Sequence, residues 1–147
     1  MVSHVLTVCT ANICRSPVAE AVLRAGLPGL TVSSAGLHAL VGRDIDPEVA
    51  DTARAQGIAL HEHAARQFDD AIGQAADVII VMETHHRQEI GQRWPHFLGK
   101  TFLLGHFDNA RQIPDPYKQA AGMQHHSVQL IAECGQTWIR QLEQMNR

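Results

Sequence analysis

The sequence predicts an α/β fold in which helices cover both faces of a parallel β-sheet. Short apolar runs rich in β-branched residues alternate with segments of helical periodicity. The run at 76–82, ADVIIVM, is continuously apolar, which is typical of a strand covered on both faces. Tight hairpin signals are few, so we expect helical crossovers to join parallel strands.

The first half of the chain is expected to contain two strands and two helices. Residues 4–8, HVLTV, have the composition of a strand. A helix is expected at 17–26, because it begins with proline and continues with apolar residues at helical spacing. A second strand is expected at 30–36. Asp46 is a candidate cap for a helix at 47–57.

The second half is expected to contain three helices and two strands. In chain order they are a helix at 68–76, the strand at 76–82, a helix at 85–93 capped by Thr84, a strand at 100–105 and a long helix from about 125. The long helix carries Ile131 and Trp138 on one side, and Cys134 lies beside them. We therefore expect Cys134 to be part of the core.

Composition limits the class of protein. The 147 residues suit one domain spanning 1–147, with 45% apolar and 18% charged residues. The net charge is −3 and no basic stripe appears, so nucleic acid is not expected as a partner. No apolar stretch is long enough for membrane insertion, and the first residues do not read as an export signal. Three cysteines make a poor disulfide framework, which favours the cytoplasm.

The segment VCTANICRSP, residues 8–17, is a candidate phosphate site. Cys9 ends the first strand, and ligands of such sheets bind beyond the carboxyl ends of strands. The five residues before Arg15 are enough to surround one tetrahedral anion with backbone N–H groups at a helix start. Arg15 would offer a planar fork to the anion. The same positive field would favour a Cys9 thiolate, so the segment predicts a nucleophile aimed at phosphorus.

Two polar residues support this interpretation. Asn12 tolerates the positive φ that a tight loop requires. Ser16 can either cap the helix or donate its hydroxyl to Cys9. The alternative is that Cys9 is a buried strand-end thiol and Arg15 a surface charge. The nucleotide-binding pattern G-x4-G-K-[ST] is absent, which argues against a nucleotide triphosphatase.

Asp115 is the candidate general acid. It lies in IPDPY, residues 113–117, between two prolines that hold the backbone extended. A carboxyl group on a stiff loop after the last strand can protonate an alcohol or phenol leaving group. A plain Asp-Pro turn is the alternative for this segment taken alone.

With these motifs, the chain resembles the low-molecular-weight protein-tyrosine phosphatases. VCTANICRSP is similar to the signature loop of that family, and DPY is similar to its acid loop. SAGLHALVG, HAARQ, LLGHFDN and IPDPY are similar to the branch found with bacterial capsule and exopolysaccharide operons. The resemblance implies a three-layer sandwich with a four-stranded parallel sheet in the order 2-1-3-4. It also implies a tyrosine-phosphorylated protein as partner, namely a bacterial tyrosine autokinase.

The resemblance implies roles for individual residues. Cys9 would be the nucleophile, Arg15 the phosphate fork, and Asp115 first the acid and then the base. No metal or other cofactor is implied. The phosphate loop would be completed by Thr10, Ala11, Asn12, Ile13, Cys14 and Ser16. The walls around the substrate ring would be Leu37, His38, Leu40 and Tyr117, which are less aromatic than in eukaryotic members.

Further roles concern support of the loop. The resemblance implies that Asn12 binds Ser34 with His63 nearby, and that Glu83 pairs with His63. Ser16 would stabilise the thiolate. A reversible disulfide of Cys14 with the nucleophile is also implied.

Two other functions stay open. Arsenate reductases share the fold and the Cys-x5-Arg loop, but they need further thiols on a mobile segment and have no use for Asp115. A non-catalytic phosphate-binding module would need neither the cysteine nor the acid. The doublets His85-His86 and His125-His126 suggest a metal, but we expect both to be solvated.

Overall fold

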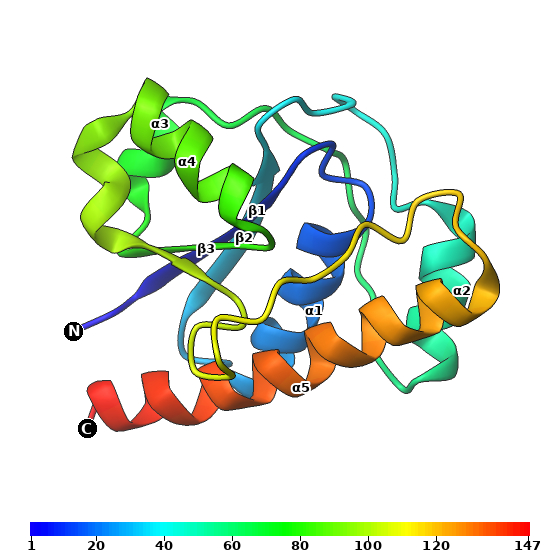
Figure 1. Ribbon diagram of the computed structural model, residues 1–147. Coiled ribbons are helices and arrows are strands. Elements are labelled where there is room, and N and C mark those ends of the chain that lie inside the picture. Colours follow the sequence, from blue (N-terminus) through cyan, green and yellow to red (C-terminus); the bar gives the residue numbers. More distant parts are fainter.

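The computed structural model describes residues 1–147, and a parallel sheet of four strands forms its centre (Figure 1). The strands lie in the order β2-β1-β3-β4, which confirms the predicted sheet. They are β1 (His4–Cys9), β2 (Thr31–Gly36), β3 (Val78–Val81) and β4 (Thr101–Leu103).

Helices cover both faces of this sheet (Figure 1). They are α1 (Arg15–Gly26), α2 (Pro47–Ala55), α3 (Asp70–Ala75), α4 (Thr84–Arg93), the 3₁₀ helix η1 (Pro95–Lys100) and α5 (Ala121–Met145). In the figure, α1, α2 and α5 lie on one side, and α3 and α4 lie on the other. None of the helices combines the length and the apolar character that crossing a membrane requires.

Two hydrophobic cores explain why the strands are apolar on both faces. Alternate side chains of a strand point to opposite faces of the sheet. Val5 and Ile80 belong to a cluster of 28 buried residues shared with α1 and α5. Leu6 and Ile79 belong to a smaller cluster of 11 residues on the other face. The continuous apolar run that predicted β3 is therefore the result of burial on both sides.

Several element boundaries differ from the prediction. Helix α1 begins at Arg15, two residues before the proline, and Cys14 occupies its cap position. Helix α5 begins at Ala121 rather than near residue 125, because its first three residues are exposed and show no helical spacing of apolar side chains. Helix η1 was not predicted, since only Phe97 of its residues is buried and no periodic pattern marks it. Thr84 is the first residue of α4, and Glu83 occupies the cap position instead.

The order of the strands determines where a ligand can bind. From β1 the chain crosses through α1 to β2 on one side, while β3 and β4 follow on the other side of β1. The carboxyl end of β1 is therefore at the switch point of the sheet. The connections from β1 and β3 run in opposite directions there, which leaves a crevice in which a ligand can bind. Cys9 is the last residue of β1 and lies in register with Gly36 of β2.

Candidate active site

The loop between β1 and α1 has the backbone arrangement of an anion site. The N–H groups from Thr10 through Ser16 donate hydrogen bonds to no acceptor of the protein. Such a run of free donors at the start of a helix carries the positive end of the helix dipole. It provides the nest of amides that the sequence predicted for a phosphate group.

Asn12 holds this loop in shape from within. The residue is fully buried and has a φ of 60°, in the left-handed region that the sequence analysis expected of it. Its Nδ2 donates to Ser16 Oγ at 2.7 Å and to Ser34 Oγ at 3.0 Å. Its Oδ1 accepts from the backbone N–H of Arg66 at 3.0 Å, a contact that was not predicted.

His63 supports the same residue from outside. Its Nε2 donates to the carbonyl oxygen of Asn12 at 2.6 Å. The expectation that Glu83 pairs with His63 is wrong. Glu83 follows β3 and faces Arg15, whereas His63 lies on the connection before α3 and reaches the loop at Asn12.

Ser16 lies in direct contact with the candidate nucleophile. Its Oγ is 3.0 Å from Cys9 Sγ, and both residues are buried. Because Ser16 Oγ accepts from Asn12, its own hydroxyl hydrogen is free to point at the sulfur. A donor in this position stabilises a thiolate. Of the two roles considered for Ser16, helix capping is not seen, because Ser16 is the second residue of α1.

Arg15 is buried and anchored at one end of its guanidinium group. Nη1 donates to Glu83 Oε2 at 2.5 Å and to the carbonyl oxygen of Ile113 at 2.9 Å. Nε is buried and has no partner in the protein. The edge formed by Nε and Nη2 is therefore left for a planar, bidentate contact with an anion.

The charge of Arg15 also determines the state of Glu83. Burial alone would raise the pKa of Glu83, but the hydrogen bonds and charges of Arg15 and His85 outweigh burial and lower the pKa. Glu83 therefore stays ionised and keeps the guanidinium group in place.

A pocket brings the two sequence motifs together. Asp115 is exposed, and its Oδ1 accepts from the backbone N–H of Tyr117 at 3.0 Å. The acid loop thus lies at the mouth of a pocket whose floor carries the thiol, although the motifs are a hundred residues apart in sequence. The pocket is lined by Cys9, Ala11, Ile13, Cys14, Arg15, Leu40, Asp115 and Tyr117.

Two of the four predicted wall residues do not line this pocket. Leu37 is buried in the smaller core on the other face of the sheet, so its prediction as a substrate wall is wrong. His38 is exposed, and its Nε2 lies 2.8 Å from the carboxylate of Glu89 on α4. Of the three predicted wall residues that follow β2, Leu40 lines the pocket.

His86 is a residue of the site that the sequence analysis missed. We expected the doublet to be solvated, and this is wrong for His86, which is only 1% exposed. Its Nδ1 accepts from the backbone N–H of Glu83 at 3.0 Å, and its Nε2 lies 2.9 Å from Thr10 Oγ1. The spacing of three residues from Glu83 to His86, typical of a capping box, was the available signal.

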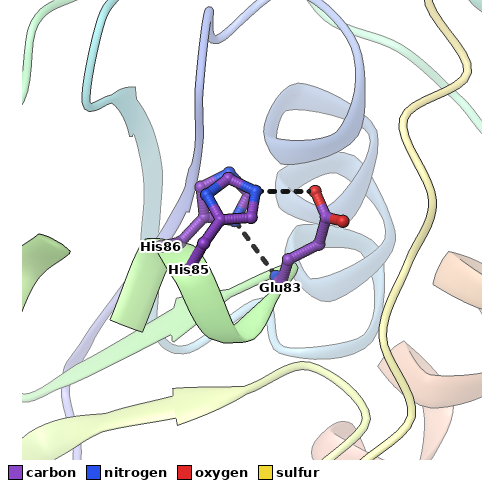
Figure 2. A group of neighbouring side chains, drawn as sticks. All are labelled: Glu83, His85 and His86. Carbon is purple, nitrogen blue, oxygen red and sulfur yellow. Dashed lines mark hydrogen bonds and ion pairs between the residues drawn. The ribbon is translucent and has the colours of Figure 1, made fainter. Parts of the chain in front are cut away.

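Glu83, His85 and His86 lie together at the start of α4 (Figure 2), with their ligand atoms within 4.8 Å of one another. Both ring nitrogens of His86 are engaged in hydrogen bonds, and Glu83 Oε2 already binds Arg15 and His85. Because no free lone pair of His86 faces the group, these residues do not fit a metal ion.

The remaining thiols are buried. Burial, followed by the negative charges of Asp46 and Cys9, raises the pKa of Cys14, so Cys14 stays a thiol at neutral pH. Burial, followed by Asp108, raises the pKa of Cys134 to about 11 within the core of α5. All three cysteines are free, and the reversible bridge between Cys9 and Cys14 stays a prediction.

Known proteins are similar to this chain in sequence and in fold. The sequence model of the family described as low molecular weight phosphotyrosine protein phosphatase matches residues 4–147. The low molecular weight protein-tyrosine-phosphatase Wzb of Salmonella typhimurium is 39% identical over 142 residues, which are 97% of this chain and 95% of that protein. The crystal structure of the tyrosine phosphatase Wzb from Escherichia coli K30 in complex with sulphate is similar with a TM-score of 0.93 and 35% identity, covering 97% of this chain and 99% of that chain. Vibrio vulnificus Wzb in complex with benzylphosphonate has a TM-score of 0.92 and 36% identity, covering 96% and 99%.

Proposed function

Because the chain belongs to the low molecular weight phosphotyrosine protein phosphatase family, and is thus a protein-tyrosine phosphatase, we propose that Cys9, Arg15 and Asp115 perform its reaction. The observation that carries this proposal is the run of unpartnered N–H groups around the buried sulfur of Cys9. A phosphate group bound by these amides and by the free edge of Arg15 would present its phosphorus atom to the thiolate.

In the first step, Cys9 Sγ forms a bond to phosphorus while the bond from phosphorus to the phenolic oxygen breaks. Asp115 gives its proton to that oxygen, so tyrosine leaves as a neutral phenol. In the second step, a water molecule attacks the cysteinyl-phosphate and Asp115 takes one of its protons. The S–P bond breaks, inorganic phosphate leaves, and the thiolate is restored with its hydrogen bond from Ser16.

The physiological substrate is proposed on the resemblance to the capsule and exopolysaccharide branch. We propose a tyrosine-phosphorylated bacterial autokinase as partner, acted on in the cytoplasm. Support comes from the similarity to Wzb of Salmonella typhimurium and from the three free cysteines, which suit a reducing compartment.

The partner is tested by trapping. Immobilised Cys9→Ser protein should retain tyrosine-phosphorylated kinase from a native-cell extract and release it on addition of free phosphate. Cys9→Ser with Arg15→Lys, in which the bidentate contact is lost, is the matched control and should retain much less. Capture of phosphoproteins without a tyrosine kinase among them would contradict the partner.

The acid is tested with two leaving groups. Asp115→Asn cannot donate a proton, so kcat for phosphotyrosine should fall by about 10²–10⁴-fold. For an aryl phosphate with a good leaving group, such as p-nitrophenyl phosphate, the fall should be much smaller. Equal losses for both substrates, or a normal rate with phosphotyrosine, would remove Asp115 from the mechanism.

A further inference from the structure

His86 joins two segments that the proposed mechanism uses separately. It lies in the first turn of α4, after β3, and contacts the loop after β1 through Thr10. Through the backbone of Glu83 it also contacts the residue whose carboxylate holds Arg15.

The hydrogen bonds define the tautomer of the ring. The N–H of Glu83 can only donate, so Nδ1 of His86 is the acceptor and carries no proton. In the neutral ring, Nε2 then carries the proton and donates to Thr10 Oγ1 at 2.9 Å. Protonation of Nδ1 would place two hydrogens against each other and break the contact with Glu83.

Burial and charge keep the ring neutral. His86 is 1% exposed, and Arg15 and His85 are the cationic groups that face it, with Glu83 as the one anion. The neutral ring is therefore a donor to the phosphate loop at neutral pH.

We propose that neutral His86 is a positioning residue that holds Thr10, and with it the first amides of the phosphate loop, in the form that binds the phosphate group. It acts through Thr10 on one side and through Glu83 and Arg15 on the other, and it touches no reacting atom. The inference rests on the proposed function of the loop. A purely structural role, in which His86 only caps α4, is the alternative.

The variant His86→Gln separates these two roles. Glutamine at the third helical position can still accept from the N–H of the capping residue, so the end of α4 keeps its partner. The flexible glutamine side chain does not hold its N–H group against Thr10 as the rigid ring does, so we expect the hydrogen bond to Thr10 to weaken. A capping role therefore predicts wild-type kinetics for His86→Gln, whereas positioning predicts a loss.

The experiment combines His86→Gln with Thr10→Val in a double-mutant cycle. For each variant we would measure kcat and KM with a phosphotyrosine peptide, the dissociation constant of inorganic phosphate by calorimetry, and unfolding in urea. We expect each single variant to weaken phosphate binding and to lower kcat/KM by about tenfold, with the double variant no worse than either single one. Thr10→Ser, which keeps the hydroxyl group, should stay near wild type.

The control is His126→Gln, an exposed histidine of α5 without hydrogen bonds, which should change none of these values. Wild-type kinetics and phosphate binding in His86→Gln would overturn the inference, and so would losses that add in the double variant. Because phosphate binding is measured without turnover, a failure of the positioning role can be told from a failure of the phosphatase activity itself.

Discussion

Asn12 is a buried polar residue that holds the phosphate loop in shape. Asn12 uses both side-chain donors, its side-chain oxygen and its carbonyl oxygen in hydrogen bonds, while it keeps a left-handed backbone. Because each polar group of the Asn12 side chain is satisfied inside the protein, Asn12 adds no unpaired buried group to the free amides of the loop.

The titration of His86 should appear in the stability of the protein. Burial, with the charges of Arg15 and His85, lowers the pKa of His86 from 6.5 to about 3. Below pH 6.5 the unfolded chain binds a proton here and the folded chain does not, so the free energy of unfolding is full above pH 6.5 and falls as the pH drops. The slope should approach ~1.4 kcal/mol per pH unit.

Urea unfolding between pH 6.5 and 4.5 measures this slope. The carboxyl groups of Glu83 and Asp77, whose pKa values are lowered, begin to contribute only toward the lower end of this window. In His86→Gln the dependence should flatten. An unchanged slope in the variant would show that His86 is already protonated in the folded protein.

Gly36 allows the phosphate loop to approach β2. A methyl group at this position would lie 2.5 Å from the carbonyl oxygen of Thr10 and 3.0 Å from Asn12. Gly36→Ala should therefore displace the loop, lower kcat/KM at least tenfold and cost about 1–3 kcal/mol of stability. Gly29→Ala, where a methyl group meets nothing within 4 Å, is the control. A fully active Gly36→Ala would mean that the loop adjusts freely.

The three proposed catalytic residues could be predicted from the sequence, because each lies in a short motif. Cys9 and Arg15 were found by their spacing, and Asp115 by its two prolines. The partner of Glu83 was missed because Arg15 is distant from it in sequence. His86 was missed because its capping-box spacing does not show which way its ring faces. Whether a histidine on α4 faces solvent or β1 depends on how the helix packs, and the spacing of apolar residues there is weak.

At the scale of elements, helix α5 carries the acid loop. Ser127 Oγ donates to the carbonyl oxygen of Pro114 at 2.9 Å, and Gln124 Nε2 donates to that of Pro116 at 3.3 Å. These bonds lie on either side of Asp115. The first turns of α5 therefore limit the motion of the carboxyl group over the pocket.

Loss of one of these bonds should affect the acid step in particular. Ser127→Ala should cost about 1 kcal/mol of stability and lower kcat for phosphotyrosine several-fold. The rate with p-nitrophenyl phosphate, which depends less on the acid, should change little. Steady-state kinetics with both substrates measure the difference. Equal losses would indicate a general disturbance of the site.

Elements with strong periodicity were predicted well, and those without it were not. The strands β1 and β3 and the body of α5 are marked by apolar residues. Helix η1 buries only Phe97, and the first three residues of α5 are exposed, so neither segment shows a helical spacing of buried apolar residues. Tertiary contacts rather than local preference decide their conformation. The predicted order of the strands came from the resemblance, since periodicity does not define which strands are neighbours.

At the scale of the molecule, the two ends of the chain are fastened to each other. Asn146 accepts from the backbone N–H of Val2 at 2.9 Å and donates to the carbonyl oxygen of Val2 at 2.8 Å. Asn146→Ala should lower the free energy of unfolding by about 1–2 kcal/mol with kcat unchanged. Urea unfolding measures this, with the exposed Gln144→Ala as control. A loss of activity would indicate that the fastening reaches the pocket.

This fastening also determines how the protein can be attached to a surface. Val2 precedes the start of β1, and Cys9 at the floor of the pocket ends it. Because Asn146 is bonded to Val2, both termini lie at the end of the sheet opposite the pocket (Figure 1). An affinity tag or a fused carrier at either terminus would point away from an incoming phosphoprotein. Protein that is attached to a bead through either terminus would therefore have its pocket on the side away from the bead.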